Sequence, residues 1–200
     1  MIFDYYYRCV LFLLRGGENG SREGALLSEG GGVEGVHFVL SPNADARPVG
    51  MPIELIVIHN ISLPAGHFGG TGIDALFLNR LDGAQHPFYA PISPMRVSSH
   101  FLIRRTGELQ QWVACLERAW HAGVSEWRGR QRCNDFSIGI ELEGTDTLPY
   151  EPAQYQCLRA LVRALKAAYP IVDIQGHSDI APRRKTDPGP AFDWFRLRGL

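Results

Sequence analysis

The sequence predicts an α/β domain with a mixed central β-sheet flanked by helices. Three observations carry this prediction: a nearly all-apolar, β-branched run over 53–59, two extended segments joined at Thr106-Gly107, and an apolar stripe at helical spacing over 152–169. The run is typical of a strand buried on both faces, whereas the joined segments indicate a hairpin and therefore an antiparallel pair. Strands mixed with helices, without an internal repeat, favour a single domain.

The chain begins with a glycine-rich region that we expect to lie outside the folded domain. Eight glycines occur between Gly16 and Gly35, with few large side chains among them. Such a composition cannot offset the entropy that is lost on ordering, so residues 1–47 are predicted to form a flexible arm or an extension upstream of the true start. The folded domain is predicted to cover residues 48–200, which is long enough for one core.

Within that domain the elements follow in order. The segment IELIVIH predicts a strand over 53–59 that ends at His59, and a short helix is predicted over 73–81. A hairpin joins 99–104 to 108–113, and SIGIELE predicts another interior strand over 137–143. The clearest helix covers 152–169 and ends before Pro170. Its inward stripe is Tyr155, Leu158, Leu161, Val162, Leu165 and Ala168; that of the short helix is Ile73, Leu76, Phe77 and Leu81.

Composition argues against several classes of partner. The 20 Lys and Arg residues nearly balance the 21 Asp and Glu residues, so no long-range field draws in nucleic acid or an anionic membrane, and a small-molecule substrate is expected. The apolar run from Cys9 to Leu14 is too short for a signal peptide or a membrane span. The four cysteines form no C-x-x-C pair, which fits free thiols in a reducing compartment and predicts a cytoplasmic protein.

Among the seven histidines, the surroundings of His59 and His177 indicate a metal site. His177 opens the segment GHSDIAPRRKTDPGP, a rigid polar loop that also carries Asp187. Two imidazoles and one carboxylate give a zinc ion three protein ligands and leave one position open for water, which is typical of catalytic sites. The alternatives are a buried structural histidine at His59 and a solvated turn in which Asp187 caps the next segment.

A zinc hydrolase also needs a general base and a cation for the developing oxyanion. The strand over 137–143 offers Glu141 and Glu143, which alternate onto the same face, so periodicity alone leaves both candidates open. Lys185, two residues before Asp187, is the candidate cation. It could instead belong to a solvated run with Arg183 and Arg184.

Five blocks in series between about Pro48 and Trp194 carry a family resemblance: VIHNISLP, RVSSHFLIRR, RAWHAGVS, RCNDFSIGIELEGTDTLPY and GHSDIAPRRKTDPGPAFDW. By these blocks the chain resembles the AmpD family of cytoplasmic 1,6-anhydro-N-acetylmuramyl-L-alanine amidases, which shares its fold with phage-type amidases and peptidoglycan recognition proteins. Long blocks in order are more specific than any single short motif. The resemblance does not extend to the first forty or so residues.

The resemblance implies one Zn²⁺ per chain, with Glu141 rather than Glu143 as general base and Lys185 as the oxyanion-stabilising cation. It implies zinc-dependent hydrolysis of the amide between 1,6-anhydro-N-acetylmuramic acid and L-alanine of muropeptides during cytoplasmic peptidoglycan recycling, a step linked to β-lactamase induction where that enzyme is inducible. The implied zinc ligands are His59, His177 and Asp187, and the implied substrate-binding residues are Asn60, Arg96 and Arg132.

Two further histidines lie in the matched blocks. Because the metal needs only three protein ligands, His100 is assigned to the core and His121 to the substrate cleft or its support. Two other functions remain open alongside the cytoplasmic amidase, which is expected to be a monomer. One is a periplasmic N-acetylmuramoyl-L-alanine amidase, which needs an export signal, and the other is a non-catalytic peptidoglycan-recognition module, which typically lacks a metal ligand.

Overall fold

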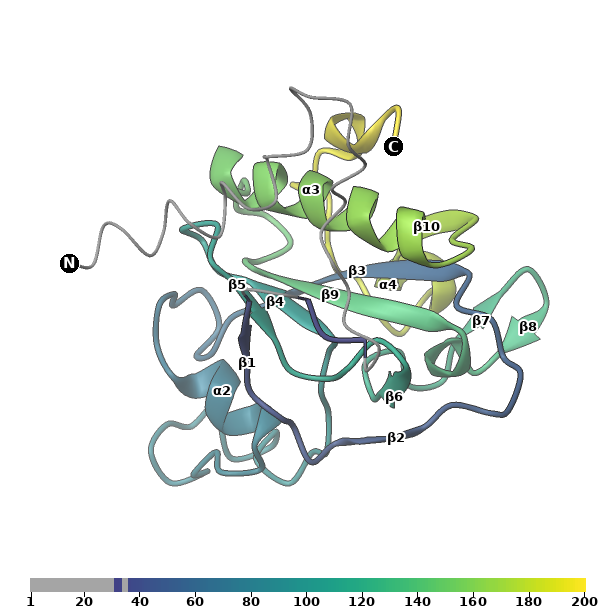
Figure 1. The fold of residues 1–200 in the computed structure, drawn as a ribbon. Helices are drawn as coiled ribbons and strands as arrows, with labels where there is room; N and C mark the ends of the chain where they lie inside the picture. The colour runs from purple at the N-terminus through teal and green to yellow at the C-terminus, as the bar shows by residue number, and fades with distance from the viewer. Residues whose placement is uncertain (1–30, 34–35) are drawn as a thin grey trace.

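The computed structural model describes residues 31–33 and 36–200, and residues 1–30 and 34–35 of the predicted arm lie outside these ranges. A six-stranded sheet forms the centre, in the order β1-β5-β4-β9-β3-β10 (Figure 1). In this sheet β4 and β5 pair antiparallel and the other neighbours pair parallel, so the predicted mixed α/β fold is confirmed. The strands are β1 (His37–Phe38), β3 (Leu55–Ile61), β4 (Phe101–Ile103), β5 (Leu109–Gln111), β9 (Ser137–Glu143) and β10 (Asp173–Gly176).

The two central strands are the two that the apolar runs predict. β3 lies between β9 and β10, and β9 lies between β4 and β3, so both strands are covered on both edges. On β3 every residue from Leu55 to His59 is buried, as the uninterrupted apolar run requires. On β9 apolar side chains alternate with Ser137, Gly139, Glu141 and Glu143, so one face of this buried strand is polar.

The predicted hairpin is formed by β4 and β5. Phe101 pairs with Gln111 and Ile103 with Leu109, and Gly107 has a φ of 87° in the connecting turn. A side chain at this position would also meet Ala153, because a Cβ built on Gly107 lies 3.0 Å from the Ala153 carbonyl oxygen. Glycine is therefore needed both for the left-handed backbone and for the close approach.

The long helix α3 (Pro152–Ala168) covers one face of the sheet (Figure 1). It begins with a capping box, in which Gln154 Oε1 accepts from the Glu151 backbone, and Pro152 occupies the first turn. The apolar stripe of α3 and the side chains of β3 and β9 that face it form one hydrophobic core. The α3 residues in this core are Tyr155, Cys157, Leu158, Leu161, Val162 and Leu165. Ala168, predicted to face inward, is exposed because it lies at the last residue of the helix.

Helix α2 (Gly72–Phe77) is shorter than the predicted range of 73–81. It ends because Asn79 takes a left-handed backbone with a φ of 59°, and the amide of Arg80 donates to the Ala75 carbonyl. These features form a Schellman-type C-terminus, which asparagine tolerates. Leu81 is nevertheless buried, as predicted, in a second core on the other face of the sheet.

Two strands lie before the boundary predicted at residue 48. β1 pairs with β5, and β2 (Ala44–Ala46) pairs antiparallel with β6 (Glu117–Ala119). Arg47 is half-buried beside them and donates to the carbonyls of Cys115, Asn134 and Ser137. The remaining elements are β7 (Glu126–Trp127), β8 (Arg130–Gln131), the 3-10 helices η1 (Cys133–Asp135) and η2 (Trp194–Leu197), and the short helix α4 (His177–Ile180).

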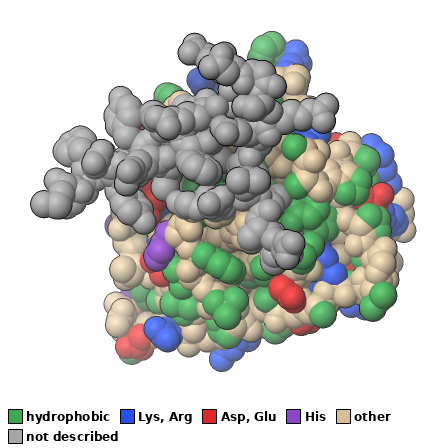
Figure 2. Space-filling view, viewed as in Figure 1, with side chains coloured by type: hydrophobic (Ala, Val, Ile, Leu, Met, Phe, Trp, Pro, Cys, Tyr) green, Lys and Arg blue, Asp and Glu red, His purple; other side chains and the backbone are tan. Residues whose placement is uncertain are grey.

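The surface charges and the helices of the described residues agree with what the composition predicts. Figure 2 shows positive and negative side chains interspersed around the visible face. Among the described residues, no helix has the length and apolar character needed to cross a bilayer. No disulfide joins the described cysteines Cys115, Cys133 and Cys157.

Candidate metal centre and active site

Three neighbouring strands bring candidate side chains to one level of the sheet. In the parallel register of β3 and β9, His59 lies opposite Glu141. In the register of β3 and β10, Gly176 lies opposite Ile58, so the next residue, His177, begins α4 at the level of His59. The carboxyl ends of parallel strands meet at one edge of a sheet, where ligands commonly bind. Register therefore places these groups together although they are distant in sequence.

The three predicted ligand side chains converge. His59 Nδ1 lies 3.0 Å from His177 Nδ1 and 3.0 Å from Asp187 Oδ2, and His177 Nδ1 lies 3.0 Å from the same carboxylate oxygen. The Asp187 carbonyl accepts from the Ser178 amide, which ties the loop to the start of α4. Nitrogen and oxygen ligands around a tetrahedral zinc ion lie about 3.3 Å apart, so this triangle is close to the size that such an ion needs. These three residues could hold a metal ion.

The donor chemistry fits a cation as well. His177 Nε2 lies 3.1 Å from the Ala122 carbonyl, which can only accept, so the hydrogen of a neutral His177 is on Nε2 and Nδ1 carries a lone pair. Burial lowers the pKa of His59 to about 4, so this imidazole is neutral at pH 7. Burial opposes ionisation of Asp187, but contacts with His177 and His59 outweigh it and lower the pKa of Asp187 below its usual range. A neutral His59 imidazole, the Nδ1 atom of His177 and a carboxylate thus face one point.

Glu141 and Glu143 have different surroundings, although they share a face of β9. Glu143 is held by the backbone amides of Gly69 and Arg105, at 2.7 and 3.1 Å, and by an ion pair with Arg104. Glu141 Oε2 is buried and has no hydrogen-bond partner within the described part of the chain. Burial, then the charge of Asp187, raise the pKa of Glu141 well above its usual value. An unpartnered buried carboxyl of this kind is suited to proton transfer.

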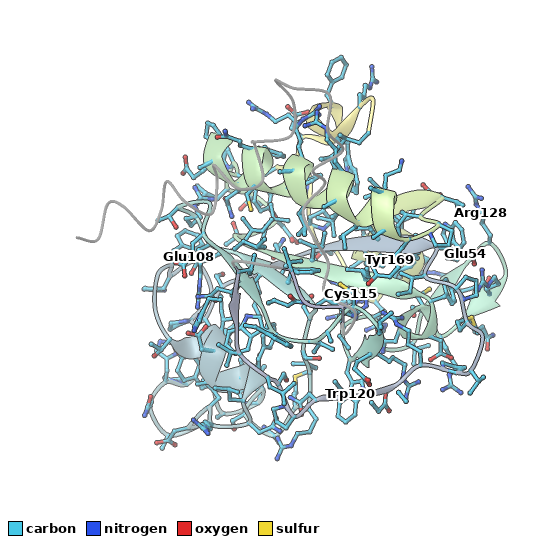
Figure 3. The ribbon with its side chains drawn as sticks, viewed as in Figure 1. Glu54, Glu108, Cys115, Trp120, Arg128 and Tyr169 are labelled. Atoms are coloured by element: carbon cyan, nitrogen blue, oxygen red, sulfur yellow. The ribbon has the colours of Figure 1, made fainter. Side chains whose placement is uncertain are left out.

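A cavity of about 490 Å³ connects these groups. His59, His177, Asp187, Glu141 and Lys185 all line it, so the two ligand segments, the carboxyl and the cation share one space. An apolar wall of the cavity comes from α2 and the segment after it. This wall comprises Leu76, Phe77, Phe88, Ile92, Met95 and Val97. Trp120 also lines the cavity and lies on the side of the sheet away from α3 (Figure 3).

Asn60 lines the same cavity, but its side-chain amide nitrogen already donates to other groups of the protein. Its Nδ2 lies 2.8 Å from Asp146 Oδ1 and 3.1 Å from the Pro188 carbonyl. Tyr150 Oη also donates to the Pro188 carbonyl, at 2.8 Å. Asn60, Asp146 and Tyr150 therefore brace the segment that carries Asp187. Sequence reasoning missed Asp146 and Tyr150; the available signal was the polar segment GTDTLPY directly after β9.

The structure does not bring the two predicted substrate arginines to the wall of this cavity. Arg96 is exposed, and its guanidinium donates to carbonyls of its own loop, at 3.1 Å for Pro94 and 3.2 Å for Met95. Arg132 has a left-handed φ of 62°, forms a 3.3 Å ion pair with Asp135, and lines a separate cavity of about 540 Å³. Substrate contact by either arginine stays a prediction.

Of the other histidines in the matched blocks, His121 contacts His59 and His100 packs against His121. His100 is fully buried, and its Nδ1 accepts from the Gly139 amide at 3.0 Å. His121 lines the cavity, and its Nδ1 lies 2.9 Å from His59 Nε2. These positions correspond to the core and to the support of the cleft.

Comparison with known proteins adds to this geometry. Residues 49–190 match the family model described as N-acetylmuramoyl-L-alanine amidase. The 1,6-anhydro-N-acetylmuramyl-L-alanine amidase AmpD of Escherichia coli K12 is 59% identical over 177 residues, which cover 88% of this chain and 97% of that protein. The AmpD of Haemophilus influenzae is 50% identical over 161 residues, covering 79% of this chain and 88% of that protein.

Solved structures agree with the fold. A crystal structure of a selenomethionine AmpD derivative has a TM-score of 0.84 and 56% identity, covering 86% of this chain and 98% of that one. The amidase AmiD of Escherichia coli, in complex with the substrate anhydro-N-acetylmuramic acid-L-Ala-D-gamma-Glu-L-Lys, has a TM-score of 0.55 and 35% identity, covering 74% of this chain and 58% of that one. The chain belongs to the N-acetylmuramoyl-L-alanine amidase family.

Proposed function

We propose that this protein is a zinc-dependent amidase that hydrolyses the amide between 1,6-anhydro-N-acetylmuramic acid and L-alanine of muropeptides, in the cytoplasmic recycling of peptidoglycan. The observation that carries the proposal is the shared cavity: three converging ligand atoms, an unpartnered buried carboxyl and a lysine line one space. The 59% identity to a protein named as an amidase for this substrate supports the choice of bond. The substrate is a small molecule, and the chain is proposed to act as a monomer.

His59, His177 and Asp187 would hold the zinc ion. When bound, the ion would lower the pKa of a water molecule and polarise the scissile carbonyl. Glu141 would accept a proton from the attacking water, since its carboxyl lies on the cavity wall and has no other partner. Lys185 would donate to the oxygen that gains negative charge as water adds to the carbonyl carbon.

The same groups complete the reaction. As the C–N bond breaks, Glu141 would pass its proton to the leaving amine of L-alanine, so that the sugar acid and the peptide leave separately. The apolar wall from Leu76 to Val97 would exclude bulk water from the reacting atoms. Asn60, Arg96 and Arg132 are proposed to contact substrate. Because the Asn60 amide donors are already used, its free group would be the carbonyl oxygen.

A turnover assay tests the proposal. We expect purified protein loaded with zinc to release the peptide from anhydro-muropeptide, to lose this activity with chelator, and to regain it when zinc is returned. Asp187→Ala removes the only charged ligand of the three and should lose both zinc and activity. Binding of anhydro-muropeptide without release of peptide, in zinc-loaded protein, would contradict an amidase and favour a recognition module.

A further inference from the structure

We propose that His121 is a positioning residue for the metal site, because it fixes the tautomer of His59 in which Nδ1 is free to bind a cation. This inference rests on the proposed metal-dependent function and concerns how one ligand is prepared. His59 has two ring nitrogens with separate neighbours. Its Nδ1 faces His177 and Asp187, whereas its Nε2 lies 2.9 Å from His121 Nδ1 on the other side.

A backbone carbonyl sets the direction of the hydrogen bonds in the row formed by His59, His121 and Ser137. Ser137 Oγ lies 2.6 Å from the Cys133 carbonyl oxygen, which can only accept, so the serine hydroxyl donates there. The same Oγ then has only lone pairs to offer to His121 Nε2, 3.2 Å away. The hydrogen of a neutral His121 is therefore on Nε2, and its Nδ1 accepts from His59 Nε2.

The groups that contact the His121 ring include two imidazoles, a hydroxyl and the backbone of β9. The residue is buried, and no acidic side chain is among its hydrogen-bond partners within the described part of the chain. Its ring packs against two other imidazoles, with centroids 5.0 Å from His59 and 5.7 Å from His100. An imidazole acceptor orients His59 without placing a carboxylate beside this ligand.

The position of the His121 ring is built into the sheet. A Cβ added at Gly139 would lie 2.6 Å from His121 Cγ and 2.8 Å from its Nδ1, so the ring rests against bare backbone of β9. The amides of His121 and Ala122 both donate to Asn134 Oδ1, at 3.2 and 2.8 Å, which fixes the loop. Ligand orientation by partners outside the coordination sphere typically changes metal affinity about 10- to 100-fold.

Two variants of similar size separate orientation from packing. His121→Asn places an oxygen near the position of Nδ1 and can still accept from His59, whereas His121→Leu cannot. We expect the zinc dissociation constant, measured by competition with a chromophoric chelator, to rise about 10- to 100-fold in His121→Leu and by less than about 5-fold in His121→Asn. A packing role alone would favour leucine in this buried position.

A matched pair of serines probes the next step of the row. Ser137→Ala removes the acceptor of His121 Nε2 and should weaken zinc binding. Ser125→Ala removes another buried hydroxyl, which accepts from the Cys133 amide at 3.1 Å and, within the described residues, forms no hydrogen bond with His121. We expect Ser125→Ala to lower stability without changing the dissociation constant for zinc.

Nitrogen-15 NMR of the wild-type side chains provides a readout that does not depend on any variant folding. We expect His121 and His59 both to carry hydrogen on Nε2 in the zinc-loaded protein. A hydrogen on His121 Nδ1, or equal zinc affinity in wild type and His121→Leu, would overturn the inference and leave the amidase proposal standing. Failure of the wild type to bind zinc would instead overturn the proposed function.

Discussion

Replacing Glu141 with glutamine tests the proton-transfer role that the site suggests. The change keeps size and removes the charge and the ability to accept a proton at neutral pH. Glu141 is 9% exposed, and one of its oxygens has no protein partner in the described chain, so few structural contacts are lost. The substitution should therefore alter chemistry far more than structure.

The expected magnitude follows from these surroundings. A positioned general base contributes about 100- to 10,000-fold, so kcat should fall at least about 100-fold, which corresponds to about 2.7 kcal/mol. Stability should move in the opposite direction. Because burial raises the pKa of Glu141 above the ordinary 4.5, the contribution of this group to the stability of the metal-free protein is lost as pH rises through the folded pKa. Glutamine does not titrate, so Glu141→Gln should gain stability over wild type as pH rises.

The assay measures peptide release from anhydro-muropeptide at saturating substrate, with zinc content determined on the same samples. Glu143→Gln is the matched control, because Glu143 lies on the same face of β9 but is held by Gly69, Arg104 and Arg105. We expect this control to lose about 2 kcal/mol of stability while keeping kcat within a few-fold of wild type. Full turnover by zinc-loaded Glu141→Gln would refute the assignment of Glu141 as base.

Three other predictions concern stability. Chelation of the metal should lower the thermal midpoint, since an ion that binds only the folded state stabilises it, and an unchanged midpoint would argue against a bound ion. In metal-free protein the pKa of His59 is lowered from 6.5 to about 4, so on acidification the unfolded state takes up this proton before the folded state does. Denaturant titrations should therefore show that the free energy of unfolding falls by about 2 kcal/mol between pH 6.5 and about pH 5. Gly189→Ala should cost more stability than Gly199→Ala and should weaken zinc binding. Both glycines have a φ of 79°, but a Cβ at Gly189 would lie 2.3 Å from Asp146 Cα, whereas a Cβ at Gly199 would meet no atom within 4 Å. Equal losses in the two glycine variants would contradict this reading of the Asp187 loop.

The elements that could be predicted from sequence are those with strong local patterns. The apolar run of β3, the alternating run of β9 and the stripe of α3 each specify their own burial, whatever surrounds them. The boundaries of helices and strands that depend on tertiary contacts could not be predicted as well. α2 ends at Phe77 because Asn79 adopts a left-handed turn, and β1 pairs with β5 although its own sequence, His37–Phe38, has no strand pattern.

The candidate site divides in the same way. Residue type and local context, strengthened by family resemblance, singled out His59, His177 and Asp187, because such groups in a rigid loop and at a strand end are costly without a use. Sequence alone left Glu141 and Glu143 equivalent, since alternation places both on one face. The structure separates their surroundings, because Arg104 and two backbone amides hold one carboxylate and none of them reaches the other.

By itself, then, the sequence determined the fold class, the main strands and helices, and the chemical groups of the site, because each depends on the composition and periodicity of a short stretch of chain. Only the tertiary structure decided which groups meet. Parallel register aligns Glu141 with His59 and brings His177, the residue after β10, to the same level, and Gly139 leaves room for the His121 ring beside His59. Distances of this kind depend on how strands far apart in the chain pair and pack, and no local pattern encodes them.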